Sequence, residues 1–103
     1  MIYNPDHVLL PKTLQLSQNY PNPFNPITTI KFALPEEGRM KLVIYNVLGQ
    51  KVKELVDEYR QAGYHQVIWN GKNDFGAQVA SGVYIYRLET VKGVQARKML
   101  LIK

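Results

Sequence analysis

The residues that could do chemistry in this chain are few and widely spaced. Of its two histidines, His7 lies near the N-terminus and His65 begins an alternating apolar run. A catalytic triad or a histidine-based metal site needs several convergent groups, and neither histidine has a serine or carboxylate at a telling spacing. The chain has no cysteine, so it holds no disulfide, thiolate metal site or cysteine nucleophile. We expect both histidines to be exposed polar residues.

Residues 70–76 are the segment most similar to a calcium-binding loop. A hard cation needs several carboxylates at alternating positions, but Asp74 is the only one here and Lys72 would oppose a cation. We expect instead a turn in which Asn and Asp side chains accept hydrogen bonds from the backbone.

The remaining carboxylates and glycines do not suggest catalysis either. Residues 36–37 and 57–58 are adjacent acidic pairs, and neighbours on a strand point to opposite faces, so neither pair forms an acid–base couple. Gly71, Gly76 and Gly82 lack the strand-then-helix context of a phosphate loop. The sequence therefore predicts a protein that is not an enzyme and that binds no metal and no cofactor.

Charge and aromatic content leave some binding functions open. The net charge is +5, but the basic residues are spread along the chain and often alternate with apolar ones. No basic cluster with interleaved aromatics indicates nucleic-acid binding. Attraction to an anionic surface such as lipopolysaccharide stays open. So does sugar stacking on the seven tyrosines, although most of them suit a core or a sheet face better.

The chain has the size of one domain, since 103 residues with 46% hydrophobic content can form a single core. No apolar run approaches the roughly 20 residues that span a bilayer. The first residues lack the basic and apolar regions of a secretory signal. An exported form would therefore need a signal elsewhere on a longer parent chain.

Residues 19–26 form a segment rich in proline and asparagine. Proline fixes φ and removes a backbone donor, and it forces the preceding residue into an extended conformation. We expect a stiff, extended segment in which Asn22 and Asn25 accept hydrogen bonds from nearby amides. We also expect Tyr20 and Phe24 to pack on the domain. The segment comprises Asn19, Tyr20, Pro21, Asn22, Pro23, Phe24, Asn25 and Pro26.

Alternating apolar residues and turn signals at intervals near ten residues predict about seven strands in an all-β antiparallel sandwich. Residues 1–13 are expected to be a linker or lead-in, with a short edge strand near residues 8–10, and residues 14–103 the domain. The core is expected to contain Trp69, Tyr84, Tyr86 and Leu88. The expected strands are residues 14–17, 28–34, 40–46, 51–59, 64–70, 82–89 and 96–102.

Residues 51–59 are ambiguous, because Val52, Leu55, Val56 and Tyr59 have helical spacing. The β-branched content and short length suit a strand with a bulge or bend. We favour the strand, since every neighbouring segment is predicted to be β.

Several motifs in order resemble the C-terminal sorting domain of the type IX secretion system, which is used by Bacteroidota and related bacteria. The resemblance runs from about Pro11 to the end, with departures at Leu14, where phenylalanine is common, and at Asn70, where aspartate is usual. The motifs lie at residues 19–32, 43–52, 62–65, 69–71, 79–88 and 98–103. Beside residues 19–26, the marked positions are Gly49, Gly63, Trp69, Gly82, Tyr84 and Tyr86.

The resemblance implies an immunoglobulin-like sandwich at the C-terminus of a larger exported protein. In that family the domain is recognised in the periplasm and directs a fused upstream cargo through the outer-membrane translocon. A sortase-like protease typically removes the domain, and the cargo is released or joined to lipopolysaccharide at the cell surface. The same sandwich is similar to a domain of flagellar hook-capping proteins. A scaffolding module or self-associating filament subunit is therefore the alternative.

The last residues of the sequence, together with the neighbouring loops, are the candidate recognition surface. A terminal strand at a sheet edge would offer unpaired backbone groups that a partner strand can extend. Lys98 and Lys103 would be polar handles. The candidate residues for translocon recognition are Lys98, Met99, Leu100, Leu101, Ile102 and Lys103.

Overall fold

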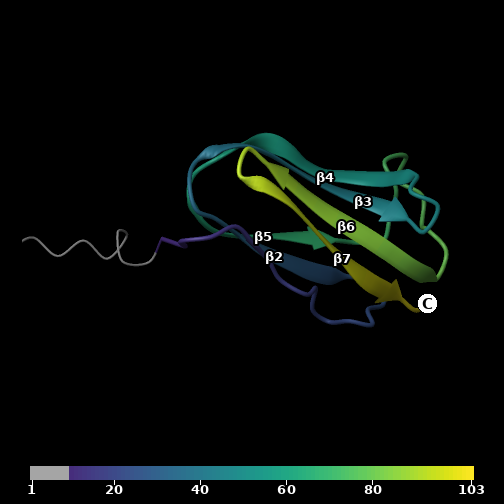
Figure 1. Cartoon of the computed structure of the whole chain (residues 1–103). Helices are drawn as coiled ribbons and strands as arrows, with labels where there is room; N and C mark the ends of the chain where they lie inside the picture. The colour runs from purple at the N-terminus through teal and green to yellow at the C-terminus, as the bar shows by residue number, and fades with distance from the viewer. Residues whose placement is uncertain (1–9) are drawn as a thin grey trace, which may run out of the picture.

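The computed structural model describes residues 10–103, which form two antiparallel sheets packed face to face (Figure 1). The three-stranded sheet has the order β1-β2-β5, and the four-stranded sheet has the order β4-β3-β6-β7. These seven strands confirm the predicted all-β, immunoglobulin-like antiparallel sandwich. Their bounds are β1 Gln15–Leu16, β2 Thr28–Leu34, β3 Gly38–Asn46, β4 Lys51–Arg60, β5 Gly63–Trp69, β6 Gly82–Thr90 and β7 Gly93–Leu101.

Strand β2 shows how alternation builds the sandwich. Ile30 and Phe32 are buried, whereas Lys31 between them is exposed. Successive side chains of a strand point to opposite faces, so β2 has one face in the core and one in solvent. Its antiparallel partner β5 continues both faces, with Lys31 opposite Gln66 on the outside. Residues 28–34 are a strand with the bounds that the sequence predicts.

Strand β4 resolves the ambiguous segment. The favoured interpretation, a strand with bulges, is confirmed by register shifts against β3 between Leu42 and Val43 and between Ile44 and Tyr45. Leu55 and Val52 are the extra residues at these shifts. A bulge rotates the following side chains relative to the sheet, so both residues pack against the core beside the buried Val56. Two bulges therefore explain the apparent helical spacing.

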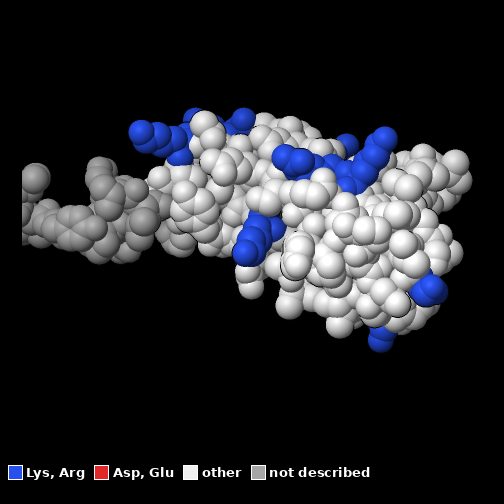
Figure 2. All heavy atoms as spheres, turned by 90° about the horizontal axis from the view of Figure 1, so that it is seen from below, with Lys and Arg blue, Asp and Glu red and all other residues white. Residues whose placement is uncertain are grey.

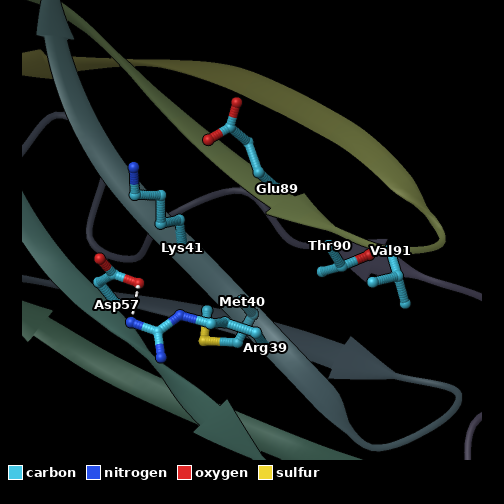
Figure 3. A pocket seen from close by; sticks show the side chains of 7 residues that line it. All are labelled: Arg39, Met40, Lys41, Asp57, Glu89, Thr90 and Val91. Atoms are coloured by element: carbon cyan, nitrogen blue, oxygen red, sulfur yellow. Dashed lines mark hydrogen bonds and ion pairs between the residues drawn. The ribbon is translucent and has the colours of Figure 1, made fainter.

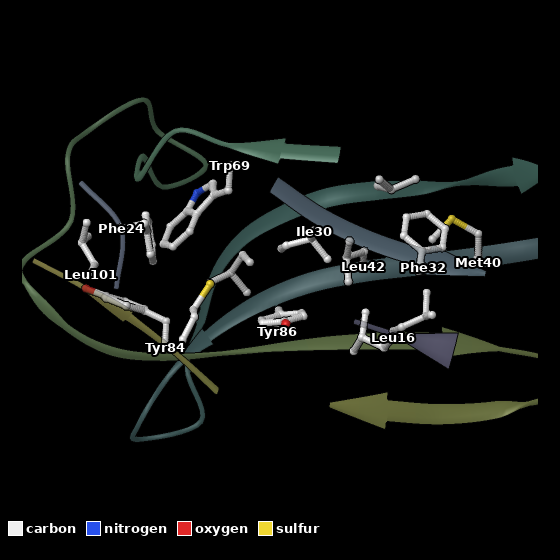
Figure 4. Packing of buried hydrophobic residues seen from close by; sticks show 14 of the residues in the cluster. Leu16, Phe24, Ile30, Phe32, Met40, Leu42, Trp69, Tyr84, Tyr86 and Leu101 are labelled. Carbon is white, nitrogen blue, oxygen red and sulfur yellow. The ribbon is translucent and has the colours of Figure 1, made fainter. Parts of the chain in front are cut away.

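The core runs the length of the sandwich between the two sheets (Figure 4). Trp69 is buried at one end, with ring centroids 5.7 Å from Phe24 and 5.5 Å from Tyr84. Tyr86 and Leu88 are fully buried further along β6. The predicted core residues on β5 and β6 are therefore confirmed, and Trp69 anchors the end of the core nearest the 19–26 segment.

The N-terminal part differs from the expectation. The first strand is only two residues long. The backbone after it stays beside β2 through the Ser17 amide and the Tyr20–Thr29 bridge, and then crosses to β7 at Phe24. The short strand expected near residues 8–10, and most of the lead-in, fall outside the described residues. Residues 10–103 include no helix with the length and apolar character needed to cross a membrane.

Candidate functional site

The proline- and asparagine-rich segment lies against the outer edge of β7. Phe24 and Leu101 form a parallel bridge. The Phe24 amide donates to the Leu100 carbonyl at 3.0 Å, and the Ile102 amide donates to the Phe24 carbonyl at 3.0 Å. The Leu100 amide donates to Asn22 Oδ1, also at 3.0 Å. The end of β7 therefore has backbone or side-chain partners on both sides.

Further along β7, side-chain hydrogen bonds join this edge to the segment around the first strand. Gln95 accepts from the Leu16 amide at 3.0 Å and donates to the Leu14 carbonyl at 2.9 Å. Arg97 Nε donates to the Leu16 carbonyl, and Gln18 Nε2 donates to the Lys98 carbonyl at 2.7 Å. These contacts join the two sheets at one lateral edge, which we call the sealed edge.

The expectation that the terminal strand presents a free backbone edge is therefore wrong. Alternation in the sequence reports the strand but not what lies beside it. Asn22 fills an acceptor role, as expected, but its partner is the distant Leu100 rather than a nearby amide. Of the two aromatic residues expected to pack, Phe24 is buried and Tyr20 is not, with 2% and 81% of their surface exposed.

A buried polar network holds the 19–26 segment in place. The Tyr86 hydroxyl donates to the Ser17 carbonyl at 2.6 Å and accepts from the Asn19 amide at 2.8 Å. Asn19 Nδ2 donates to Thr28 Oγ1 at 2.9 Å and to the Pro21 carbonyl at 3.1 Å. Burial raises the pKa of Tyr86, partly opposed by the Asn19 amide and the Arg97 charge. These motif positions are thus structural partners of one another.

The six candidate recognition residues point either into the core or toward solvent. Met99 and Leu101 are buried in the core, whereas Lys98 and Lys103 are exposed. Leu100 is half-buried and lies opposite Val83 on β6. We call the outward set of Lys98, Leu100 and Ile102 the terminal-strand face. It is the part of the terminal strand that a partner could contact through side chains.

The remaining motif residues occupy turns and strand starts. Gly49 lies in the turn between β3 and β4 with φ of 81°, a conformation that glycine adopts without strain. Gly63 and Gly82 begin β5 and β6. Asn70 and Asn73 accept hydrogen bonds from nearby backbone amides, which confirms the expected turn chemistry of the 70–76 loop.

The groups considered for catalysis do not converge. His65 is half-buried rather than exposed as expected, because it stacks on Phe32 at 5.3 Å and has Nε2 2.8 Å from the Gln61 carbonyl oxygen. His7 lies outside the described residues. Within residues 10–103, no three His, Cys, Asp or Glu side chains are grouped as metal ligands would be.

An open hollow of about 410 Å³ lies on the outer face of the four-stranded sheet (Figure 3). Its charged groups are arranged across the strands, with Lys41 between Asp57 on β4 and Glu89 on β6. Arg39 pairs with Asp57 at 3.0 Å, and Arg87 pairs with Glu89. Cross-strand charge pairs such as Arg39–Asp57 stabilise a solvated sheet face.

Charge is distributed unevenly over the surface. The face in Figure 2 shows Lys and Arg side chains and no Asp or Glu. Among residues 10–103, the basic side chains that form no ion pair are Lys12, Lys31, Lys41, Lys72, Arg97, Lys98 and Lys103.

The two sheets, their order and the sealed edge define an immunoglobulin-like β-sandwich domain. The chain belongs to the FlgD Ig-like domain family, whose model matches residues 26–93. No curated protein matched the chain in a sequence comparison.

Solved structures share the fold at low sequence identity. Dimeric latent PorU from Porphyromonas gingivalis has a TM-score of 0.66 at 22% identity, covering 82% of this chain and 9% of PorU. PorZ, an essential surface component of the type IX secretion system of P. gingivalis, has a TM-score of 0.58 at 22% identity, and the match covers 87% of this chain and 11% of PorZ. FlgD from P. aeruginosa has a TM-score of 0.58 at 20% identity, and the match covers 72% of this chain and 61% of FlgD. The chain thus spans less than two thirds of each of these proteins.

Proposed function

We propose that this domain is a C-terminal secretion signal that directs a fused upstream cargo across the outer membrane through the type IX secretion system. The observation that carries the proposal is the terminal-strand face, held in a fixed position by β6 on one side and by Asn22 and Phe24 on the other. The ordered sequence motifs support it. So does the shared fold with PorU and PorZ, in which a domain of this size is a small part of a long chain.

Because of the sealed edge, we expect a translocon to recognise side chains of the terminal strand and not its backbone. Strand addition needs unpaired backbone groups, and at this edge the Lys98 carbonyl, the Leu100 amide and carbonyl, and the Ile102 amide already have partners. Recognition therefore uses the side chains of Lys98, Leu100 and Ile102, with Lys103 beside them. In this proposal the domain is exported, passes through the periplasm and reaches the outer-membrane surface. A sortase-like protease then removes it, and the cargo is released or joined to lipopolysaccharide.

A reporter fused to residues 10–103, in a bacterium that has this secretion system, tests the proposal. We expect the double variant Lys98→Gln/Leu100→Ser to reduce surface delivery at least about tenfold and to accumulate in the periplasm. The matched control is Lys41→Gln/Val94→Ser, because both of its residues are exposed elsewhere on the same sheet.

All variants must first show unchanged circular dichroism and thermal midpoints, since loss of the fold would also abolish delivery. Full surface delivery of the folded terminal-strand variant would refute recognition by this face. Failure of the unmodified fusion to leave the periplasm would refute the secretion role itself.

A scaffolding module at the cell surface is the second candidate, favoured by membership in the FlgD Ig-like domain family. The gene around this domain distinguishes the two. A long upstream passenger with a signal peptide agrees with a secretion signal, whereas a gene encoding only this domain and a signal peptide agrees with a structural subunit that self-associates.

A further inference from the structure

Two loops of the sandwich share one backbone hydrogen-bond pattern. The first loop is residues 46–50, between β3 and β4, and the second is residues 73–77, between β5 and β6. In each loop the amide of the asparagine donates to the carbonyl four residues later, at 3.0 Å from Asn46 and 2.9 Å from Asn73. The glycine amide then donates back to the asparagine carbonyl, at 3.0 Å from Gly49 and 3.0 Å from Gly76.

The asparagine side chains complete the same pattern. Asn46 Oδ1 accepts from the Leu48 amide at 3.0 Å and from the Gln50 amide at 3.0 Å. Asn73 Oδ1 accepts from the Phe75 amide at 2.9 Å and from the Ala77 amide at 3.0 Å. Both loops are therefore fixed by their own backbone and asparagine, and need no contact from the side chains at their tips.

The same position of each loop carries a large apolar side chain directed at solvent. Leu48 is 79% exposed and Phe75 is 94% exposed, the latter more than any other large hydrophobic residue of the described chain. Val47 next to Leu48 is exposed as well. Neither tip contributes to the core, so the fold gives no reason for apolar residues there. Paired exposed apolar residues on rigid supports are typical of a contact site.

The second loop is held against the start of β4, which directly follows the first loop. The Asp74 amide donates to the Val52 carbonyl at 3.0 Å, and Asp74 Oδ1 accepts from the Glu54 amide at 3.1 Å. A hollow of about 240 Å³ between the loops is lined by residues of both, among them Asn46 and Phe75. Leu48 and Phe75 therefore lie at the same end of the sandwich.

Basic residues flank both tips. Lys51 follows the first loop directly and is ion-paired with Glu54 at 3.4 Å. Lys72 precedes the second loop and forms no ion pair with the described residues. The one carboxylate within the two loops, Asp74, is paired with Lys53 at 3.8 Å. Projecting apolar side chains with lysines at their base match an anionic lipid surface, in which the apolar groups enter the headgroup region and the lysines approach phosphates. An extended peptide would need a groove or a free strand edge instead.

We propose that this pair of loops docks on an anionic lipid surface, with Leu48 and Phe75 inserted and Lys51 and Lys72 at the phosphates. The inference does not depend on the secretion role. Because both loops are already ordered, little conformational entropy is lost on docking.

Co-sedimentation of the 103-residue chain with vesicles tests the proposal. We expect binding to mixed phosphatidylglycerol and phosphatidylcholine vesicles and little binding to phosphatidylcholine alone. Leu48→Ser/Phe75→Ser should weaken binding at least about tenfold, since it removes the inserted apolar surface. The matched control is Tyr64→Ser/Val91→Ser, because these residues have similar exposure, 67% and 76%, and lie on other loops and strands.

A second pair of variants tests the charges. Lys51→Gln/Lys72→Gln should weaken binding severalfold and reduce its dependence on salt, whereas Lys12→Gln/Lys31→Gln should leave it near the unmodified level. Equal affinity for both kinds of vesicle, or undiminished binding of the folded Leu48/Phe75 variant, would overturn the proposal. Failure to bind vesicles, with the loop variants still impairing surface delivery, would overturn it in favour of a protein partner.

Discussion

The two lateral edges of the sandwich differ in how their outer strands are covered. At the sealed edge, β7 is joined to the segment before β2 by backbone and side-chain hydrogen bonds. At the opposite edge, β4 pairs only with β3, and β5 only with β2. There the loop at Asp74 covers the start of β4 alone, and we call this side the open edge.

The comparison shows two ways of preventing unwanted strand pairing. An unpaired edge recruits other chains unless it is covered, bent or charged. The sealed edge is covered. The open edge combines two bulges in the β3–β4 pairing with ion pairs such as Arg39–Asp57 and Arg60–Glu58. We therefore expect variants at the sealed edge to change stability more than variants at the open edge.

The largest effect is expected from Phe24→Ala. Removing a buried aromatic that packs against Trp69 should lower the free energy of unfolding by about 3–5 kcal/mol. Tyr20→Ala, four residues away and exposed, should change it by about 0.5 kcal/mol or less. Denaturant unfolding measures both, and similar losses would mean that the segment does not depend on its buried anchor.

The next effect is expected from Tyr86→Phe. The variant keeps the ring but leaves the buried Asn19 amide and Ser17 carbonyl without their hydroxyl partner. Unpaired buried groups should lower the free energy of unfolding by about 1–3 kcal/mol. Tyr45→Phe, on the solvent side of β3, is the control. Equal stability of the two variants would show that the network does not hold the sealed edge.

High pH should weaken the sealed edge through the same residue. Burial raises the pKa of Tyr86 and of Tyr84 above 10.0, so the native state holds these protons more tightly than the unfolded state. Their contribution is complete below about pH 10 and is lost as pH rises beyond it. Unfolding midpoints between about pH 8 and 12 should fall above pH 10, and less steeply in Tyr86→Phe. A slope unaffected by the substitution would contradict this.

A smaller effect is expected from Asn22→Ala. It removes one partly solvated hydrogen bond to the Leu100 amide, so the stability loss should be about 0.5–1.5 kcal/mol. The sharper measurement is hydrogen exchange, in which the Leu100 amide should lose protection while amides shared by β3 and β6 keep theirs. Unchanged protection at Leu100 would mean that the cover is weak.

The smallest effect is expected at the open edge, from Arg39→Gln. Its ion pair with Asp57 is solvent-exposed, and such pairs contribute about 0.2–1 kcal/mol. The change should barely move the unfolding midpoint. A loss comparable to that of Phe24→Ala would erase the proposed difference between the edges.

The sequence predicts the strands well but not the contacts between distant segments. Residues 28–34 show their pattern directly, since the buried Thr28, Ile30 and Phe32 alternate with the more exposed Thr29 and Lys31. The bulges at Val52 and Leu55 could only be suspected, because the extra residues imitate a helical period. The cover of β7 is invisible to periodicity, since Asn22 and Leu100 are 78 residues apart in the chain.

The candidate site shows the same limit. Tyr20 and Phe24 are both aromatic residues that precede or follow proline, and only the turn between them decides which one enters the core. The repeated asparagine-to-glycine spacing at residues 46–49 and 73–76 was readable in principle. Its meaning depends on two loops from different parts of the chain reaching one end of the sandwich.

The bridge between Phe24 and Leu101 also ties the domain to the order of its synthesis. Leu101 leaves the ribosome long after Phe24. Phe24 therefore cannot pair with β7 until nearly the whole sandwich has been synthesised. A shortened product would keep Phe24 exposed and would be an easy substrate for proteases and chaperones. The sealed edge can therefore close only after β7 has been synthesised.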